Sequence, residues 1–268
     1  MRGKLAEWRV WALRAGRSQM DRSLATYLTG MGQPLIIPHT MFVLVGEMTV
    51  VVDTSFSSVS EVRSAYPQEI WRADDEEPVV LLRELGISPL AVELVICTHL
   101  HYDHCGGNAS FPNAQVIVQE RELEYALAPT SQLMIREYFS PGWGFPATFD
   151  KDSLSLVRGD AEVSPGLRLL ALPGHTPGSQ GALVDTSHGV LALPGDLIML
   201  YENFTETIPV GLHTDVDAWY SSCARLKAAC DGVAPSHDMR LFGRDAIVEL
   251  TDADDGASRS VWLRRGRG

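Results

Sequence analysis

Residues 98–107 read THLHYDHCGG and directly follow the apolar run Leu94–Cys97. A short apolar run of this kind is typical of a buried β-strand. Three histidines and one aspartate therefore lie where a core strand ends and a loop begins. Imidazole and carboxylate groups are ligands of zinc and similar ions, and burying four of them together is costly unless a cation organises them. Because the chain has only 8 histidines, we interpret this cluster as a metal site.

The composition is that of an ordinary globular protein. The chain has 268 residues, 45% hydrophobic and 21% charged, which is enough apolar material for a large core. We predict a single domain over residues 1–268. The formal net charge of −12 argues against nucleic acid and anionic membranes as partners. No apolar run approaches the roughly 20 residues that cross a bilayer.

The cysteines indicate a reducing environment. Cys97, Cys105, Cys223 and Cys230 include no CxxC pair, and the last two lie two turns apart in a helical pattern, too far to bridge. The N-terminal residues are charged and lack the apolar segment of a secretory signal. We therefore expect free thiols and a cytoplasmic protein.

Hydrophobic patterns predict alternating strands and helices. Strands are expected at residues 7–13, 41–45, 48–52, 94–97, 116–118, 167–172, 181–184 and 190–193, and helices at 76–85, 120–127 and 219–230. Gly46 and Glu47 predict a hairpin between two of these strands. This order favours stacked sheets with helices outside, an α+β sandwich.

Residues 128–149 are predicted to form a loop. Its aromatic part, Tyr138–Phe149, is open to three interpretations. It is a surface segment that covers the core, a lid over the pocket of a small-molecule substrate, or the contact surface of a homodimer.

Three later residues can complete a metal site. They are His175 in LPGHTPG, Asp196 in LPGD and His237 in PSHD. Each lies at a Gly or Pro corner, and such a corner holds a side chain in a fixed place. His39, His188 and His213 have no comparable context, so we expect structural or surface roles for them.

The candidate ligands are too many for one metal ion. The full set is His99, His101, Asp103, His104, His175, Asp196 and His237. One tetrahedral zinc ion needs four ligands at most. Two metal ions that share one carboxylate account for the excess, and such a pair can activate water and polarise a carbonyl group together.

The HLHYDH motif at residues 99–104, with Gly106 and Gly107 after it, resembles the HxHxDH signature of the metallo-β-lactamase superfamily. The resemblance extends from Met41 to about Asp238 and implies a four-layer αββα sandwich with a dinuclear site, usually two Zn²⁺. It assigns one metal to His99, His101 and His175, the other to Asp103, His104 and His237, and a bridging role to Asp196. The residues alone do not distinguish Zn²⁺ from Mn²⁺, Fe²⁺ or Co²⁺.

Within the superfamily the chain is most similar to the N-acyl homoserine lactonase-like branch. The features that indicate this are Asn108 after the motif, FPNA at 111–114, ENF at 202–204 and SHD at 236–238. Other branches fit less well. Glyoxalase II-type thioester hydrolases add a C-terminal helical domain, and the flavodiiron branch replaces His101 with Glu. Many β-lactamases have Cys in place of Asp103, and RNA-processing branches carry basic surfaces.

The resemblance implies a hydrolase that opens a small cyclic ester (a lactone) by attack of a metal-bridging hydroxide. Asp103 would carry the proton to the leaving oxygen. Lactonases of this branch often place Tyr three residues after the bridging Asp, where this chain has Met199. Tyr201 is the candidate to contact the substrate carbonyl instead. The departure leaves a cyclic amide or imide, or a thioester, as alternative substrates.

A non-catalytic metal-binding module is a further hypothesis, because a fold can be retained without its activity. The intact ligand set argues against it.

Overall fold

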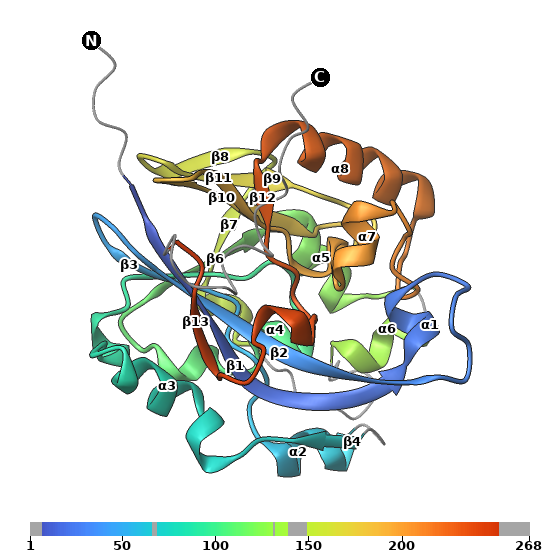
Figure 1. Cartoon of the computed structure of the whole chain (residues 1–268), viewed down its shortest axis with the longest axis horizontal. Helices are drawn as coiled ribbons and strands as arrows, with labels where there is room; N and C mark the ends of the chain where they lie inside the picture. The colour runs from blue at the N-terminus through green and yellow to red at the C-terminus, as the bar shows by residue number, and fades with distance from the viewer. Residues whose placement is uncertain (1–6, 66–68, 131, 139–148, 252–268) are drawn as a thin grey trace.

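The structure, a computed structural model, describes residues 7–65, 69–130, 132–138 and 149–251. Within these ranges the strands form an eight-stranded and a five-stranded sheet (Figure 1). In spatial order the first sheet contains β13 (Ile247–Glu249), β1 (Arg9–Asp21), β2 (Pro34–Val45), β3 (Thr49–Val52), β5 (Leu94–Ile96), β6 (Gln115–Gln119) and β7 (Leu154–Val157), and β4 (Glu69–Trp71) pairs with β1. The second contains β12 (Gly232–Val233), β11 (Gly189–Leu193), β10 (Gln180–Thr186), β9 (Leu167–Ala171) and β8 (Ala161–Ser164).

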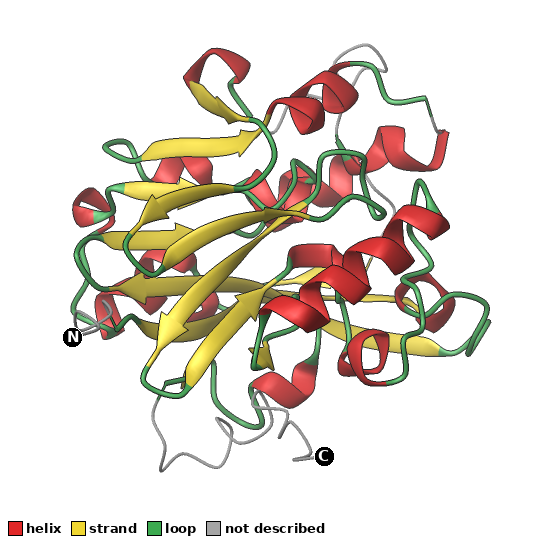
Figure 2. Ribbon diagram, turned by 90° about the horizontal axis from the view of Figure 1, so that it is seen from above, coloured by secondary structure: helices red, strands yellow, loops and turns green. Residues whose placement is uncertain are grey.

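Helices flank the strands on both sides (Figure 2). The α-helices are α1 (Arg22–Ala25), α2 (Val59–Ala65), α3 (Pro78–Glu84), α4 (Tyr102–Cys105), α5 (Glu120–Leu127), α6 (Gln132–Glu137), α7 (Tyr201–Thr205) and α8 (Val216–Ala229). Short 3-10 helices lie at Asp74–Glu76, Pro89–Ala91, Asn108–Ser110, Lys151–Ser153, Gly195–Leu197 and Met239–Leu241.

Successive side chains of a strand pack alternately between the two sheets and against the outer helices. In β3, Val50 and Val52 belong to the core between the two sheets, whereas Val51 packs with residues of α3 on the outer face. This is the two-residue period of a strand buried on both faces. In β11, Leu191 and Leu193 likewise face the inter-sheet core, and Ala192 faces the apolar side of α8. The result is the predicted four-layer αββα sandwich of the metallo-β-lactamase fold.

The candidate metal motif at residues 98–107 follows strand β5, so it lies at one end of the sandwich. Strand β5 pairs in parallel with β3 and β6, and parallel strands need crossover connections outside the sheet. The carboxyl ends of β3 and β5 therefore lie side by side, which brings Asp53 next to Thr98. Since loops at such ends project from a rigid sheet, they are suited to holding functional side chains.

Most predicted elements are confirmed, with shifted ends. The first strand extends to Asp21, past the predicted end at Leu13, and the helix predicted from Glu76 begins at Pro78. The predicted loop at 128–149 was wrong in part, because α6 lies within it. Met134 and Tyr138, four residues apart, are both buried in the core. This spacing is typical of a helix but was not used to predict one.

Other sequence expectations have mixed outcomes. All four cysteines are buried and none is in a disulfide. No described helix is long and apolar enough to cross a bilayer. Residues 139–148 of the aromatic segment lie outside the described residues, as do 1–6 and 252–268, so the single domain over 1–268 stays a prediction.

Trp8 connects the two sheets and provides a test of the packing. Its side chain is buried in the inter-sheet core, and its indole N–H donates to the Pro165 carbonyl at 3.0 Å. Trp8→Ala should lower the free energy of unfolding by about 3–5 kcal/mol, because it leaves a large cavity. Urea denaturation would measure this. Trp8→Phe, which keeps most of the volume, should lose less, and equal losses would contradict a packing role.

Candidate metal centre

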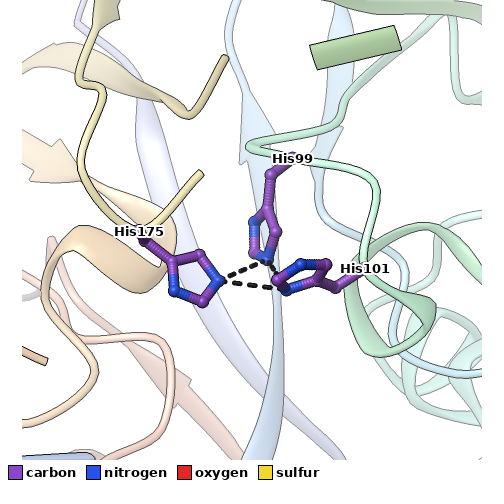
Figure 3. A group of neighbouring side chains, drawn as sticks. All are labelled: His99, His101 and His175. Atoms are coloured by element: carbon purple, nitrogen blue, oxygen red, sulfur yellow. Dashed lines mark hydrogen bonds between the residues drawn. The ribbon is translucent and has the colours of Figure 1, made fainter. Parts of the chain in front are cut away.

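The structure brings all seven predicted ligands together at the end of the sandwich. Three imidazoles converge first. His99 Nε2 lies 2.9 Å from His101 Nδ1, and His175 Nε2 lies 3.2 and 3.0 Å from these two atoms (Figure 3). A neutral imidazole has one N–H donor, so three mutually adjacent ring nitrogens cannot all be satisfied by one another. Ligands at about 2.0–2.1 Å from a tetrahedral Zn²⁺ stand about 3.3 Å apart, close to the observed separations.

The remaining four residues form the adjacent cluster. Asp196 Oδ1 lies 3.2 Å from His104 Nε2 and 3.0 Å from His237 Nε2. Asp103 lies 3.7 Å from His104 and 3.6 Å from His237. Asp196 Oδ2 also reaches within 3.6 Å of His175. Asp196 is thus placed between the two clusters, as a bridging carboxylate would be.

In three of the imidazoles the far nitrogen is held by a fixed acceptor. His175 Nδ1 donates to the Leu212 carbonyl at 2.6 Å, and His237 Nδ1 donates to the Pro38 carbonyl at 2.8 Å. His104 Nδ1 contacts the carboxylate of Asp53 at 2.7 Å. Because these acceptors fix the tautomer, the Nε2 lone pair of these three rings faces the centre. Metal-binding histidines in proteins are held in this way. His101 instead faces the centre with Nδ1, and its buried Nε2 has no hydrogen-bond partner.

Asp53 organises both His99 and His104. Its carboxylate accepts from the Thr98 backbone N–H at 2.7 Å and from Thr98 Oγ1 at 2.8 Å. Since the Thr98 hydroxyl proton is used there, His99 Nδ1 must donate to Thr98 Oγ1, 3.0 Å away. Asp53 adopts a left-handed φ of 57°, which Asp tolerates better than most residues. The sequence analysis missed this role, although Asp53 stands directly after a predicted strand.

His104 provides a test of whether a cation fits. Its Nε2 is buried and has no hydrogen-bond partner, although Asp196 Oδ1 is near, because the angle is outside hydrogen-bond geometry. Burial lowers the pKa of His104, but the neighbouring carboxylates of Asp196, Asp103 and Asp53 outweigh it and raise the pKa well above its usual value. The carboxylates therefore favour positive charge at this position, as a divalent metal ion would supply. The donor set fits two such ions.

In the first cluster the net shift of the pKa is in the opposite direction, because carboxylates do not outweigh burial there. Burial lowers the pKa of His99 and His101 well below the usual value, and nearby histidines add to the effect. These rings are therefore neutral near pH 7. A neutral imidazole is the form that binds a metal ion.

The position of Asp196 requires a glycine at residue 195. Gly195 has a left-handed φ of +54°, and a Cβ there would lie 2.5 Å from Thr98 Oγ1. A side chain at this position would thus push into the group that orients His99. The close approach of the two loops explains why a Pro-Gly corner precedes Asp196.

Glu122 joins the loops that carry the first cluster. It is fully buried and accepts from Leu100 N–H, Tyr138 Oη and Thr176 Oγ1 at 3.0, 2.8 and 2.6 Å. Leu100 stands between two candidate ligands and Thr176 follows a third. Burial raises the pKa of Glu122, and these hydrogen bonds oppose the shift. Glu122 is a positioning residue that the sequence analysis did not identify.

Two further candidates occupy different surroundings. Met199 lines the cavity next to the metal cluster, together with His39. Tyr201 begins α7 and is buried, with the Arg240 guanidinium over its ring at 5.1 Å. His39, expected to be structural or at the surface, is buried and contacts Asp103 at 3.0 Å.

Glu122→Gln should loosen the first cluster. An amide cannot accept all the hydrogen bonds of a carboxylate, so we expect a loss of about 2 kcal/mol or more in unfolding free energy, together with weaker zinc binding. Chemical denaturation and zinc titration would measure both. Glu120→Gln is the matched control, because Glu120 pairs with Arg158 at the surface, where such pairs contribute little. Equal effects of the two substitutions would contradict this role.

Comparison with known proteins agrees with the fold and the motif. The family model of the metallo-beta-lactamase superfamily matches residues 36–234. An N-acyl homoserine lactonase of Bacillus cereus is 30% identical over 251 residues, which cover 90% of this chain and 94% of the relative. The N-acyl homoserine lactonase AttM of Azorhizobium caulinodans is 36% identical over 154 residues, covering 54% of this chain and 56% of that protein.

A solved structure shows the same architecture. It is an N-acyl homoserine lactone hydrolase with the product N-hexanoyl-L-homoserine bound at its catalytic metal centre. It superposes with a TM-score of 0.72 at 27% identity, covering 88% of this chain and 95% of that one. These matches confirm the resemblance to the lactonase branch, and the chain belongs to the metallo-beta-lactamase superfamily.

Proposed function

We propose that this protein is a dinuclear zinc hydrolase that opens the ring of N-acyl homoserine lactones. The observation that carries the proposal is the convergence of the candidate ligands on a cavity of about 420 Å³. A cavity of this size suits a small molecule. The lactonase relatives, similar over 90% of the chain, support the choice of substrate.

The ligand assignment follows the two clusters. One metal ion would be held by His99, His101 and His175. The other would be held by Asp103, His104 and His237, with Asp196 between the two positions. Two ions in these positions would supply a nucleophilic hydroxide near neutral pH and polarise the ester carbonyl. Zinc suits the imidazole-rich donor set.

Asp103 is the residue we assign to proton transfer. It lies at the cavity wall and is 9% exposed. Burial raises its pKa, but His104 and the hydrogen bond from His39 outweigh this and hold the pKa well below its usual range. An ionised carboxylate at this place can accept the proton of the attacking water and pass it to the leaving oxygen of the opened ring.

The cavity wall suits an acyl chain. Met20, Leu24 and Ile37 line the cavity from β1, α1 and β2, and Leu212 lines it from the segment before α8. Apolar walls with a few polar groups are typical of small-molecule sites. Gln19, Asp21, Glu69 and Glu137 also line this cavity. The lactone ring would lie at the metal cluster, and the acyl chain would extend along the apolar residues.

Met199 favours a second candidate function. Lactonases of this branch often carry Tyr at this place, and Met199 gives the cavity no hydroxyl group there. Another lactone or a cyclic imide, whose carbonyl group is bound without a tyrosine hydroxyl at this place, is that second substrate. A role of Tyr201 in substrate contact stays a prediction, to be tested with Tyr201→Phe.

Several wider properties also stay predictions. They are the cytoplasmic location, the absence of nucleic-acid and membrane partners, and a homodimer formed through Tyr138–Phe149.

A substrate panel tests the proposed reaction. Proton release by the zinc-loaded protein near neutral pH should be fastest with N-acyl homoserine lactones. Plain γ-lactones, a cyclic imide, a thioester and a penicillin should react more slowly. Turnover of one of these with none of homoserine lactones would exclude the proposed substrate while keeping the hydrolase. Metal-loaded protein that turns over no compound would favour the non-catalytic module.

Asp196→Ala tests the metal pair. Removing the carboxylate between the clusters should abolish most activity and lower bound zinc from about two ions to about one. Elemental analysis of the purified protein would measure the zinc. Chelation of the unaltered protein should give the same loss of activity, restored by added zinc. Full activity with normal zinc content in Asp196→Ala would rule out the assigned ligands.

A further inference from the structure

His39 is a buried histidine outside the proposed ligand set. Its side chain lies on β2, with Nδ1 3.0 Å from Asp103 Oδ2 and Nε2 3.0 Å from Ser18 Oγ. Among the imidazoles within 4 Å of the Asp103 carboxylate it is the closest, because His104 and His237 lie 3.7 and 3.6 Å away. The shortest of these three contacts of Asp103 is therefore with a residue that the metal motif does not include.

The backbone is shaped around this side chain. The register between β1 and β2 shifts between Arg14 and Arg17, so that residues 15 and 16 lie opposite the single residue His39. This is a β-bulge, which changes the direction of side chains and is frequent beside active sites. Ser18, just beyond the bulge, supplies the hydroxyl group that contacts His39.

Gly16 and Phe56 complete the pocket of the imidazole. Gly16 has a φ of +119°, and a Cβ there would lie 2.7 Å from the Phe56 ring. Phe56 in turn packs edge-on against His39, with ring centroids 5.1 Å apart. The Arg72 guanidinium stacks over Phe56 at 3.8 Å. The Phe56 ring thus confines the imidazole of His39. This ring fits there only because residue 16 is glycine.

The hydrogen bonds around His39 have one consistent direction. An ionised carboxylate only accepts hydrogen bonds, so His39 Nδ1 donates to Asp103. The other nitrogen of the neutral ring is then an acceptor, and Ser18 Oγ donates to it. Asp103 Oδ1 lies 3.7 Å from His104 Nε2, whereas Oδ2 lies 3.0 Å from His39 Nδ1 and 3.6 Å from His237 Nε2. The His39 ring lies beside that of His237, with centroids 5.6 Å apart.

We propose that His39 is a positioning residue that holds Oδ2 of Asp103, so that Oδ1 faces the second metal position and the leaving oxygen. Its contribution to catalysis rests on the proposed function, whereas its effect on the metal site does not. Partners that orient metal ligands typically change metal affinity or activity by about 10–100-fold, which sets the expected size of the effect.

Three variants separate orientation from packing. His39→Leu removes the donor and keeps similar volume, His39→Asn keeps an N–H near the position of Nδ1, and Ser18→Ala removes the support behind the ring. His188→Leu, at an exposed position, is the matched control. Zinc affinity by chelator competition, the Co²⁺ absorption spectrum, kcat and KM would be measured for each, with melting temperature to confirm folding.

We expect His39→Leu to weaken binding of the second zinc ion about tenfold or more and to change the Co²⁺ spectrum. Its kcat should fall by a similar factor, with a smaller change in KM. His39→Asn should restore most of both properties, and Ser18→Ala should lie between the two. Equal zinc affinity in His39→Leu and the unaltered protein would overturn the proposal. So would an equal loss in His39→Asn and His39→Leu. The zinc measurements hold even if no lactone is hydrolysed.

Discussion

The site depends on burying five imidazoles and two carboxylates at one end of the sandwich. Each buried ring needs a partner for its N–H and a reason to keep its lone pair directed inward. The carbonyl groups of Leu212 and Pro38, the carboxylate of Asp53 and the hydroxyl of Thr98 meet the first need for four of the five rings. A pair of cations would meet the second, because the inward-facing nitrogens cannot satisfy one another. The packing of the fold and the geometry of the metal site therefore depend on the same buried hydrogen bonds.

Two carboxylates outside the candidate ligand set, those of Asp53 and Glu122, hold the ligand-bearing loops in place. Asp53 orients His104 directly and His99 through Thr98, and Glu122 joins the loops around Leu100 and Thr176. Each is buried and accepts several hydrogen bonds, which lowers the cost of keeping a charge in the interior. These residues hold ligands from separate loops at fixed distances. A site built from loops can be as rigid as the sheets beneath it when such groups join them.

Strand β2 contacts two of the candidate metal ligands. The Pro38 carbonyl fixes the tautomer of His237, and the next side chain, His39, contacts Asp103. One short segment therefore acts on two candidate ligands of the same metal position. The bulge in β1 makes this arrangement possible, since it changes the pairing at the point where the strand passes the cluster. The apolar side of the cavity begins on the same two strands, so metal geometry and substrate space are physically linked.

The sequence alone determined the αββα sandwich, by resemblance, and all seven candidate ligands. Local signals sufficed for these ligands. His99, His101, Asp103 and His104 cluster directly after an apolar run, and the three later ligands each stand at a Gly or Pro corner. The strand and helix periods likewise follow from short-range patterns, although α6 was missed because it has only 6 residues. Asp53, Glu122 and His39 were not found as site residues, since their roles come from contacts across 51, 22 and 64 positions of the chain. Only the tertiary structure decided them, because the direction of a buried hydrogen bond depends on which strands meet and in which register.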